Sequence, residues 1–266
     1  QAIAGWNTPG RILIDDNFLE AAGMPFLMGG SDPNISGLIP TGITFTNNYL
    51  TKRLAWMTAA STWVVKNIFE LKNASGVRVS GNIMENNWHK NQTGEAILFT
   101  PRNQNGTAPW CTVEDVVFEH NVVRHAAAAF NILGTDSPDT SGTLNRLTIQ
   151  HNLIYDINGW TYVSTDHRAS GLGQAIQTGH GGEDFIFDHN TVYSSGGSLP
   201  VFLYGLSKPR EGQQITNNLF YFHNDATSLG SIFEGQTGTT PNCWTLTGKA
   251  WMDCALTPSY NFAGNV

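Results

Sequence analysis

Seven stretches of the sequence share one pattern, which decides the fold: ILIDDNFLE (residues 12–20), ITFTNNYLT (43–51), VRVSGNIMEN (77–86), VVFEHNVVRH (116–125), LTIQHNLIYD (147–156), FIFDHNTVYS (185–194) and ITNNLFYF (215–222). In each stretch apolar residues alternate with polar ones up to an asparagine, and a second alternation follows it. The aligned asparagines are Asn17, Asn48, Asn82, Asn121, Asn152, Asn190 and Asn218, and successive ones lie 28 to 39 residues apart. A repeat of this length indicates a solenoid.

The alternation on either side of each asparagine predicts two short strands that meet at a sharp bend. Asparagine tolerates the left-handed backbone that such a bend needs, and its amide can bond to the equivalent asparagine of the next coil. A third apolar segment precedes each pair: PFLMGG, IFELKN, AILFTPRN, AFNILGT, AIQTGH, VFLYGL and SIFEGQ. Three strands in each of about seven coils predict an all-β, right-handed parallel β-helix, with residues 1–266 as a single domain.

Two other repeat architectures fit the sequence less well. A leucine-rich or helical solenoid requires a sustained helical period of apolar residues, which no segment carries. A β-propeller requires four strands per blade joined by hairpin turns, and the sequence lacks Asn-Gly or Asp-Gly turns at regular spacing.

The composition limits the partners of the protein. Charged residues are only 13% of the chain, glycine occurs 28 times and the formal net charge is −7. The negative charge argues against a broad nucleic-acid-binding face, and no apolar run reaches the roughly 20 residues that span a bilayer. We therefore expect no nucleic-acid partner and no membrane span.

The cysteines indicate an oxidising compartment. Cys243 and Cys254 enclose a short segment within a C-terminal loop region (residues 236–266), and we predict a disulfide between them. Cys111 is expected to be buried and free. The disulfide predicts an extracellular or periplasmic location.

The N-terminal segment QAIAGWN is expected to be a strand that begins in mid-coil. A β-helix exposes unpaired backbone and apolar core at an uncapped end. We therefore expect that a cap or upstream coils precede this segment, or that another subunit covers it. The second arrangement corresponds to head-to-tail self-association, which builds fibres.

The repeat resembles the pectate-lyase-like superfamily of right-handed parallel β-helices. The resemblance rests on IDDN, FEHN and FDHN at the bend and on TPRN and TGHGG after the first strand of a coil, and it covers nearly the whole chain. Members of this superfamily include polysaccharide lyases, hydrolases and epimerases, and phage tailspikes. The resemblance implies a carbohydrate ligand that lies along the outer face of the first strands.

Charged residues gather on that outer face in a chain that is otherwise poor in charge. Aligning IFELKN with LFTPRN places Glu70 beside Thr100 and Lys72 beside Arg102 on adjacent coils, about 4.8 Å apart. The same column extends over the neighbouring coils, so that one strip contains Asp32, Glu70, Lys72, Arg102, Asp136 and His180.

The strip has residue types that β-elimination from a uronic acid requires: a group that neutralises the carboxylate, a base for the C5 proton and an acid for the leaving oxygen. Alginate- and chondroitin-type lyases of the superfamily have a similar layout, which implies Lys72 as the base and Arg102 as the ligand of the carboxylate. His180 is a third catalytic candidate. Glu70 and Asp32 are candidate ligands of Ca²⁺, although the longer calcium motif of those lyases is absent.

Each of these residues also has a structural interpretation. Glu70, Lys72 and Arg102 can form a solvated ion-pair ladder of little energetic weight, and Asp32 and Asp136 fall in turns, where aspartate is common.

Histidines and tryptophans complete the candidates. Gly179-His180-Gly181 resembles a polygalacturonase-like hydrolase, but the aspartates that such an enzyme needs do not surround it. His120, His151 and His189 recur at equivalent places and are interpreted as stacked bend residues. Glu70, Asp136 and the tryptophans Trp88, Trp110 and Trp160 are candidates for substrate binding, the tryptophans by stacking on sugar rings or, alternatively, buried under a loop.

The sequence therefore favours an extracellular, carbohydrate-active protein that binds an acidic polysaccharide, with β-elimination as the expected reaction. The alternative is a non-catalytic, structural or adhesive β-helix, such as a tailspike, surface or filament subunit.

Overall fold

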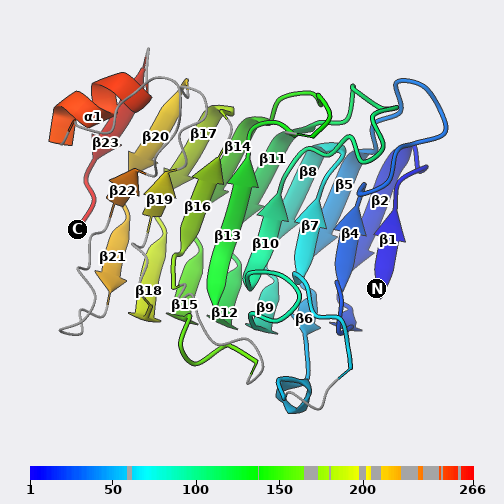
Figure 1. Ribbon diagram of the computed structural model, residues 1–266, viewed down its shortest axis with the longest axis horizontal. Coiled ribbons are helices and arrows are strands. Elements are labelled where there is room, and N and C mark those ends of the chain that lie inside the picture. Colours follow the sequence, from blue (N-terminus) through cyan, green and yellow to red (C-terminus); the bar gives the residue numbers. More distant parts are fainter. Residues whose placement is uncertain are drawn as a thin grey trace.

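The chain forms three parallel β-sheets that run side by side along one axis (Figure 1). The computed structural model describes residues 1–58, 62–136, 138–164, 173–179, 181–197, 202–204, 211–222, 233–235, 246, 248–256 and 259–266. Within these residues, sheet A contains β1 (Ile3–Gly5), β4 (Phe26–Met28), β7 (Phe69–Leu71), β10 (Glu95–Phe99), β13 (Ala128–Leu133), β16 (Ile176–Gly179), β19 (Phe202–Tyr204) and β22 (Phe233–Gly235). Sheet B contains β2 (Gly10–Asp15), β5 (Thr41–Thr46), β8 (Ala74–Ser80), β11 (Val113–Glu119), β14 (Asn145–Gln150), β17 (Glu183–Asp188), β20 (Gln213–Thr216) and β23 (Tyr260–Ala263). Sheet C contains β3 (Phe18–Glu20), β6 (Tyr49–Thr51), β9 (Ile83–Asn87), β12 (Val122–Ala126), β15 (Leu153–Asn158), β18 (Thr191–Gly196) and β21 (Leu219–Phe222).

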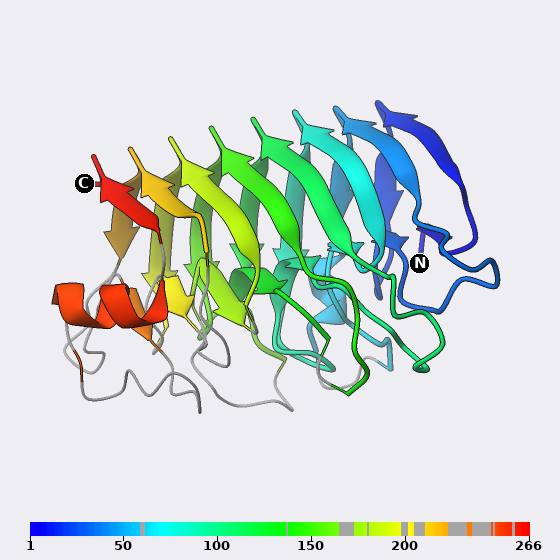
Figure 2. The ribbon, with the colours of Figure 1, turned by 90° about the horizontal axis from the view of Figure 1, so that it is seen from above.

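Each coil contributes one strand to sheet A, then one to sheet B and one to sheet C, and each strand pairs in parallel with the equivalent strand of the next coil. The predicted parallel β-helix with three strands per coil is confirmed. Figure 2 shows the long connections on one side of the coil, away from the bend between sheets B and C. These connections flank sheet A, because they join sheet C to sheet A and sheet A to sheet B.

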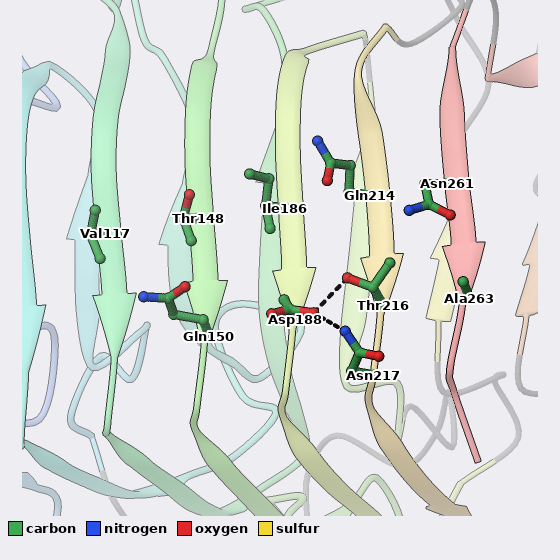
Figure 3. A pocket seen from close by; sticks show the side chains of 10 residues that line it. All are labelled: Val117, Thr148, Gln150, Ile186, Asp188, Gln214, Thr216, Asn217, Asn261 and Ala263. Atoms are coloured by element: carbon green, nitrogen blue, oxygen red, sulfur yellow. Dashed lines mark hydrogen bonds between the residues drawn. The ribbon is translucent and has the colours of Figure 1, made fainter.

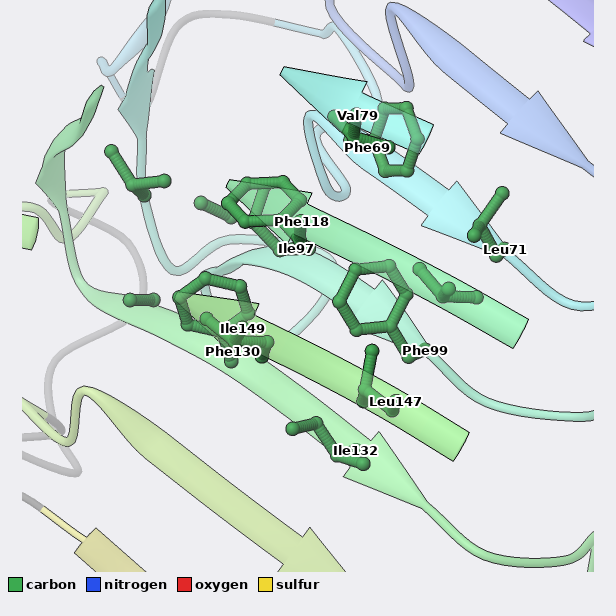
Figure 4. Close-up of a cluster of buried hydrophobic side chains, with 14 of the residues drawn as sticks. Phe69, Leu71, Val79, Ile97, Phe99, Phe118, Phe130, Ile132, Leu147 and Ile149 are labelled. Atoms are coloured by element: carbon green, nitrogen blue, oxygen red, sulfur yellow. The ribbon is translucent and has the colours of Figure 1, made fainter. Parts of the chain in front are cut away.

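Phenylalanine rings packed edge to face fill the interior (Figure 4). The ring centroids of Phe69 and Phe99 lie 6.4 Å apart, those of Phe99 and Phe118 lie 6.0 Å apart, and those of Phe118 and Phe130 lie 5.4 Å apart. All four rings are fully buried, and burial of each contributes about 1.5–3 kcal/mol relative to exposure. The core is therefore continuous from coil to coil.

The asparagines at the bend form the predicted ladder. Asn121 Nδ2 donates to Asn152 Oδ1 at 3.2 Å, and Asn82 Nδ2 donates to Asn121 Oδ1 at 2.9 Å. Equivalent bonds connect Asn17 to Asn48, Asn48 to Asn82 and Asn190 to Asn218. Asn265, outside the seven repeats, extends the ladder by accepting a bond from Asn218. Since the amides are buried, the expected inward orientation of Asn82, Asn121, Asn152 and Asn190 is confirmed.

The residue before each ladder asparagine has the left-handed backbone of the bend, and not the asparagine itself as the sequence predicted. His120, His151 and His189 have φ of 55°, 54° and 51°. Their rings stack outside the coil, with centroids 5.3 Å apart for His120 and His151 and 5.1 Å apart for His151 and His189. These histidines are bend residues, as the sequence predicted.

The C-terminal region contains a helix that the sequence analysis missed. Helix α1 (Gly248–Ala255) lies within the segment interpreted as a loop, and Trp251, Met252 and Cys254 pack against the main core. Cys111 is buried and free, as predicted. Cys243 lies outside the described residues, so the disulfide stays a prediction.

Among the described residues there is no helix of sufficient length and apolar character to span a membrane. The part of the chain that the structure describes contains one other helical element, a single 3₁₀ turn, Leu54–Trp56, in the connection before β7.

Candidate functional site

The strands of sheet A pair in a register that differs from the predicted one. Glu70 pairs with Leu98 of the next coil and Leu27 of the preceding coil. The predicted position of Glu70 beside Thr100 is therefore wrong by two residues. A two-residue slip keeps the same side chains on the outer face, so the alternation of the sequence does not detect it.

The two predicted cations nevertheless lie on adjacent coils. The backbone N–H of Arg102 donates to the carbonyl of Lys72 at 3.0 Å. Lys72 follows directly after β7, and Arg102 follows β10 by three residues. The backbones of Lys72 and Arg102 therefore lie side by side on adjacent coils, just after the C-terminal ends of β7 and β10.

Glu70 is a buried carboxylate surrounded by lysines. Its side chain is 2% exposed, and Oε2 lies 3.5 Å from the ammonium of Lys72, which is 18% exposed. Burial raises the pKa of Glu70 above its ordinary value, while the charges of Lys72, Lys66 and Lys52 act in the opposite direction. Oε1 of Glu70 is buried without a hydrogen-bond partner in the described part of the chain. Because a buried oxygen of this kind is costly, Glu70 is an unusual residue for a purely structural ladder.

Arg102 forms an ion pair with Asp136 on the following coil. Nη1 of Arg102 lies 2.9 Å from Oδ1 of Asp136, and the side chains are 34% and 3% exposed. The other carboxylate oxygen of Asp136 accepts the backbone N–H of Asn103 at 2.9 Å. Asp136 therefore fixes the turn that carries Arg102, and the guanidinium remains partly open to solvent.

Asp32 joins two loops at the same side of sheet A. Its Oδ2 accepts the backbone N–H groups of Asn105 and Thr107 at 3.1 and 3.0 Å and the hydroxyl of Thr107 at 2.6 Å. Burial acts to raise the pKa of Asp32, but these hydrogen bonds hold it below its ordinary value. Trp110 adds a second link, since its indole N–H donates to the carbonyl of Leu38 at 3.2 Å.

The candidate Ca²⁺ ligands do not fit a calcium site. One oxygen of Asp32 is occupied by the loop, and Glu70 lies against an ammonium group, whereas Ca²⁺ requires six to eight oxygen ligands. Within the described ranges, no three His, Cys, Asp or Glu side chains are placed to hold a metal ion together.

The tryptophan candidates differ in accessibility. Trp88 is fully buried in a small second core with Val65, Ala127, Ala128 and Tyr162. Its ring cannot stack on a sugar, which corrects the role expected for it. Trp110 is half-buried, whereas Trp160 is 43% exposed, so Trp160 is the tryptophan candidate most open to a ligand.

His180, the third catalytic candidate, lies outside the described residues.

A network on the outer face of sheet C was not predicted. Nδ1 of His125 lies 2.7 Å from Oδ2 of Asp156 and 3.1 Å from the hydroxyl of Tyr162, and Ser195 donates to the other oxygen of Asp156 at 2.9 Å. His125 and Asp156 have φ of 53° and 52°. In the sequence, His125 and Asp156 each lie two places after the apolar pair of the strand that follows the ladder asparagine. This recurrence was the available signal, but the sequence prediction gave it no role.

Comparison of the chain with protein-family models, with curated proteins and with solved structures finds no match.

Proposed function

We propose that the protein binds an acidic polysaccharide along the outer face of sheet A and cleaves it by β-elimination, as an extracellular or periplasmic enzyme of the pectate-lyase-like type. The observation that carries the proposal is the adjacency of Lys72 and Arg102 on neighbouring coils, with Glu70 buried beneath Lys72.

The local charge supports an anionic substrate. Lys66 and Lys72 act on Glu70, and Arg102 follows on the next coil, so three basic side chains lie on this side of the molecule together with the carboxylates of Asp32, Glu70 and Asp136. The formal net charge of the whole chain is −7. This cluster of basic side chains on an otherwise acidic protein attracts the carboxylates of a polyanion to this face.

The proposed reaction uses the two basic side chains in different roles. The Arg102 guanidinium binds the uronate carboxylate and stabilises the negative charge that develops when the C5 proton leaves. Lys72, in its neutral form, takes that proton through Nζ. The electron pair of the C5–H bond forms the C4=C5 double bond, the C4–O bond breaks, and the proton held by Lys72 passes to the leaving oxygen. Glu70 is a positioning residue that holds Lys72.

The experiment measures the unsaturated product by its ultraviolet absorbance with alginate, pectate and glycosaminoglycans, with and without added Ca²⁺. We expect at least one polyanion to give a rising signal. Lys72→Met and Arg102→Gln should each lower kcat/KM by about 100-fold or more, within the range for loss of an acid–base or charge-stabilising group.

Arg78→Gln is the matched control for Arg102→Gln. Arg78 also pairs with a carboxylate of the next coil, Glu119, at 2.9 Å, but on sheet B. This variant should keep full activity. A flat trace with every polyanion contradicts the lyase proposal and favours the non-catalytic adhesive or structural β-helix, with or without self-association.

A further inference from the structure

A shallow groove of about 630 Å³ lies on the outer face of sheet B, away from the sheet A site (Figure 3). Two outward rows of side chains form it. One row runs through Val117, Thr148, Ile186, Gln214 and Asn261, and the other runs through Gln150, Asp188, Thr216 and Ala263. The first row crosses five coils and therefore spans about 19 Å, at roughly 4.8 Å per coil. The groove suits an elongated ligand parallel to the axis.

Several polar side chains in the groove are available to bond to a ligand. Within the described residues, Thr148, Gln214 and Asn261 form no side-chain hydrogen bond, although each lies in the groove lining. An amide offers both a carbonyl acceptor and N–H donors, and a hydroxyl offers both functions in one atom. Val117 and Ile186 lie in the same row and provide apolar floor between these groups.

The charge of the groove disfavours an anionic ligand. Asp188 is its charged lining residue, and it accepts hydrogen bonds from Thr216 at 2.5 Å and Asn217 at 2.9 Å. Burial acts to raise the pKa of Asp188, but the hydrogen bonds of Thr216, His189 and Asn217 hold it below its ordinary value. Asp188 is therefore ionised at neutral pH and repels carboxylates and phosphates.

The backbone of the groove excludes a peptide strand. Its N–H and C=O groups already pair between β11, β14, β17, β20 and β23, and a peptide that extends a sheet needs a free strand edge. A ligand with many neutral hydroxyl groups and apolar C–H faces meets all of these conditions.

We propose that this groove is a binding site for a neutral oligosaccharide, separate from the proposed uronate site on sheet A. The hydroxyls of the sugar bond to Thr148, Gln214 and Asn261, and its C–H face packs on Val117 and Ile186. The proposal does not rest on the lyase activity.

The experiment follows the methyl resonances of Val117 and Ile186 by NMR during titration with β-1,4-linked hexasaccharides of glucose, mannose and galactose, and with hexagalacturonate. At least one neutral hexasaccharide should shift both residues saturably at millimolar concentration, and hexagalacturonate should not. Thr148→Val should weaken that binding by about two- to tenfold, the value of one neutral hydrogen bond.

Thr44→Val is the matched control, because Thr44 occupies the same outward row of sheet B, three coils before Thr148 and outside the groove. This variant and Lys72→Met should both bind like the unchanged protein. Ile186→Arg, which fills the groove, should abolish the shifts of Val117. Absence of saturable shifts with all three neutral sugars overturns the proposal, as does an equal effect of Thr44→Val and Thr148→Val.

Discussion

At the scale of single residues, Asn121 satisfies hydrogen bonds on both sides of its coil. Its Nδ2 donates to Asn152 Oδ1 of the next coil at 3.2 Å and to the carbonyl of Val79 of the preceding coil at 3.0 Å, and its Oδ1 accepts the backbone N–H of Asn82 at 2.9 Å. Asn121→Leu leaves these buried groups unpaired, which should lower the free energy of unfolding by on the order of 1–3 kcal/mol. Urea unfolding measures the change. Asn261→Leu, on an exposed position of β23, should change it by less than about 0.5 kcal/mol, and equal effects of the two variants contradict the role of the ladder.

Lys52 is a buried lysine whose charge links stability to pH. Its Nζ donates to the carbonyls of Gly23 at 2.5 Å and Asn67 at 2.9 Å. Burial lowers the pKa of Lys52 from 10.5 to about 7, against the charge of Glu70. Between these two values the unfolded chain holds a proton that the folded chain lacks, so the contribution of Lys52 to stability rises with pH. Denaturant unfolding at several pH values from about 7 to 10 should therefore show a steeper rise for the unchanged protein than for Lys52→Met. If stability rises equally with pH in the two proteins, the result contradicts the lowered pKa of Lys52.

At the scale of elements, structural features that recur in every coil can be predicted from the sequence. Features that depend on contacts between distant segments cannot. The asparagine register is correct because a ladder amide needs one residue type at one place in every coil. The register of β7 and β10 is wrong because any shift by an even number of residues preserves the alternation. The sequence leaves open whether Trp88 stacks on a sugar or is buried, because the residues that cover it, Val65 and Tyr162, come from segments far away in the chain. His125 and Asp156 occupy equivalent positions of adjacent coils, 31 residues apart, but the repeat does not indicate that a histidine and an aspartate interact there.

Helix α1 bears on the disulfide prediction. Cys254 lies within α1 and packs against the core, and Cys111 is free. If Cys243 pairs with Cys254, a thiol reagent added to the unfolded, unreduced protein should modify one cysteine, and the peptide that contains Cys111 should carry the label. Reduction before labelling should raise the number to three. Three labelled cysteines without reduction contradict the disulfide.

At the scale of the whole molecule, ionised carboxylates connect the coils along the outer surface. Glu119 accepts hydrogen bonds from Arg78 and Gln150 at 2.9 Å each, from the coils before and after it. Asp188 accepts bonds from the following coil in the same way. Because each coil contacts only its neighbours, such lateral bonds add to a stability that is approximately a sum over interfaces.

These carboxylates predict that the solenoid loses stability in acid. Burial acts to raise the pKa of Asp156, but hydrogen bonds from Tyr162, His125 and Ser195 hold it below its ordinary value of 3.8. A group whose pKa is lowered on folding stabilises the fold above its unfolded pKa, and this contribution disappears as pH falls through the folded value. The urea midpoint should therefore decrease from about pH 5 downward, and Asp156→Asn should decrease less steeply than the unchanged protein, because it has no carboxylate to protonate there. Asp16→Asn is the control, since Asp16 is exposed and forms no side-chain hydrogen bond within the described residues; its curve should follow that of the unchanged protein. Identical slopes for Asp156→Asn and Asp16→Asn contradict the assignment, because the acid sensitivity then comes from groups other than the carboxylate that joins His125, Tyr162 and Ser195.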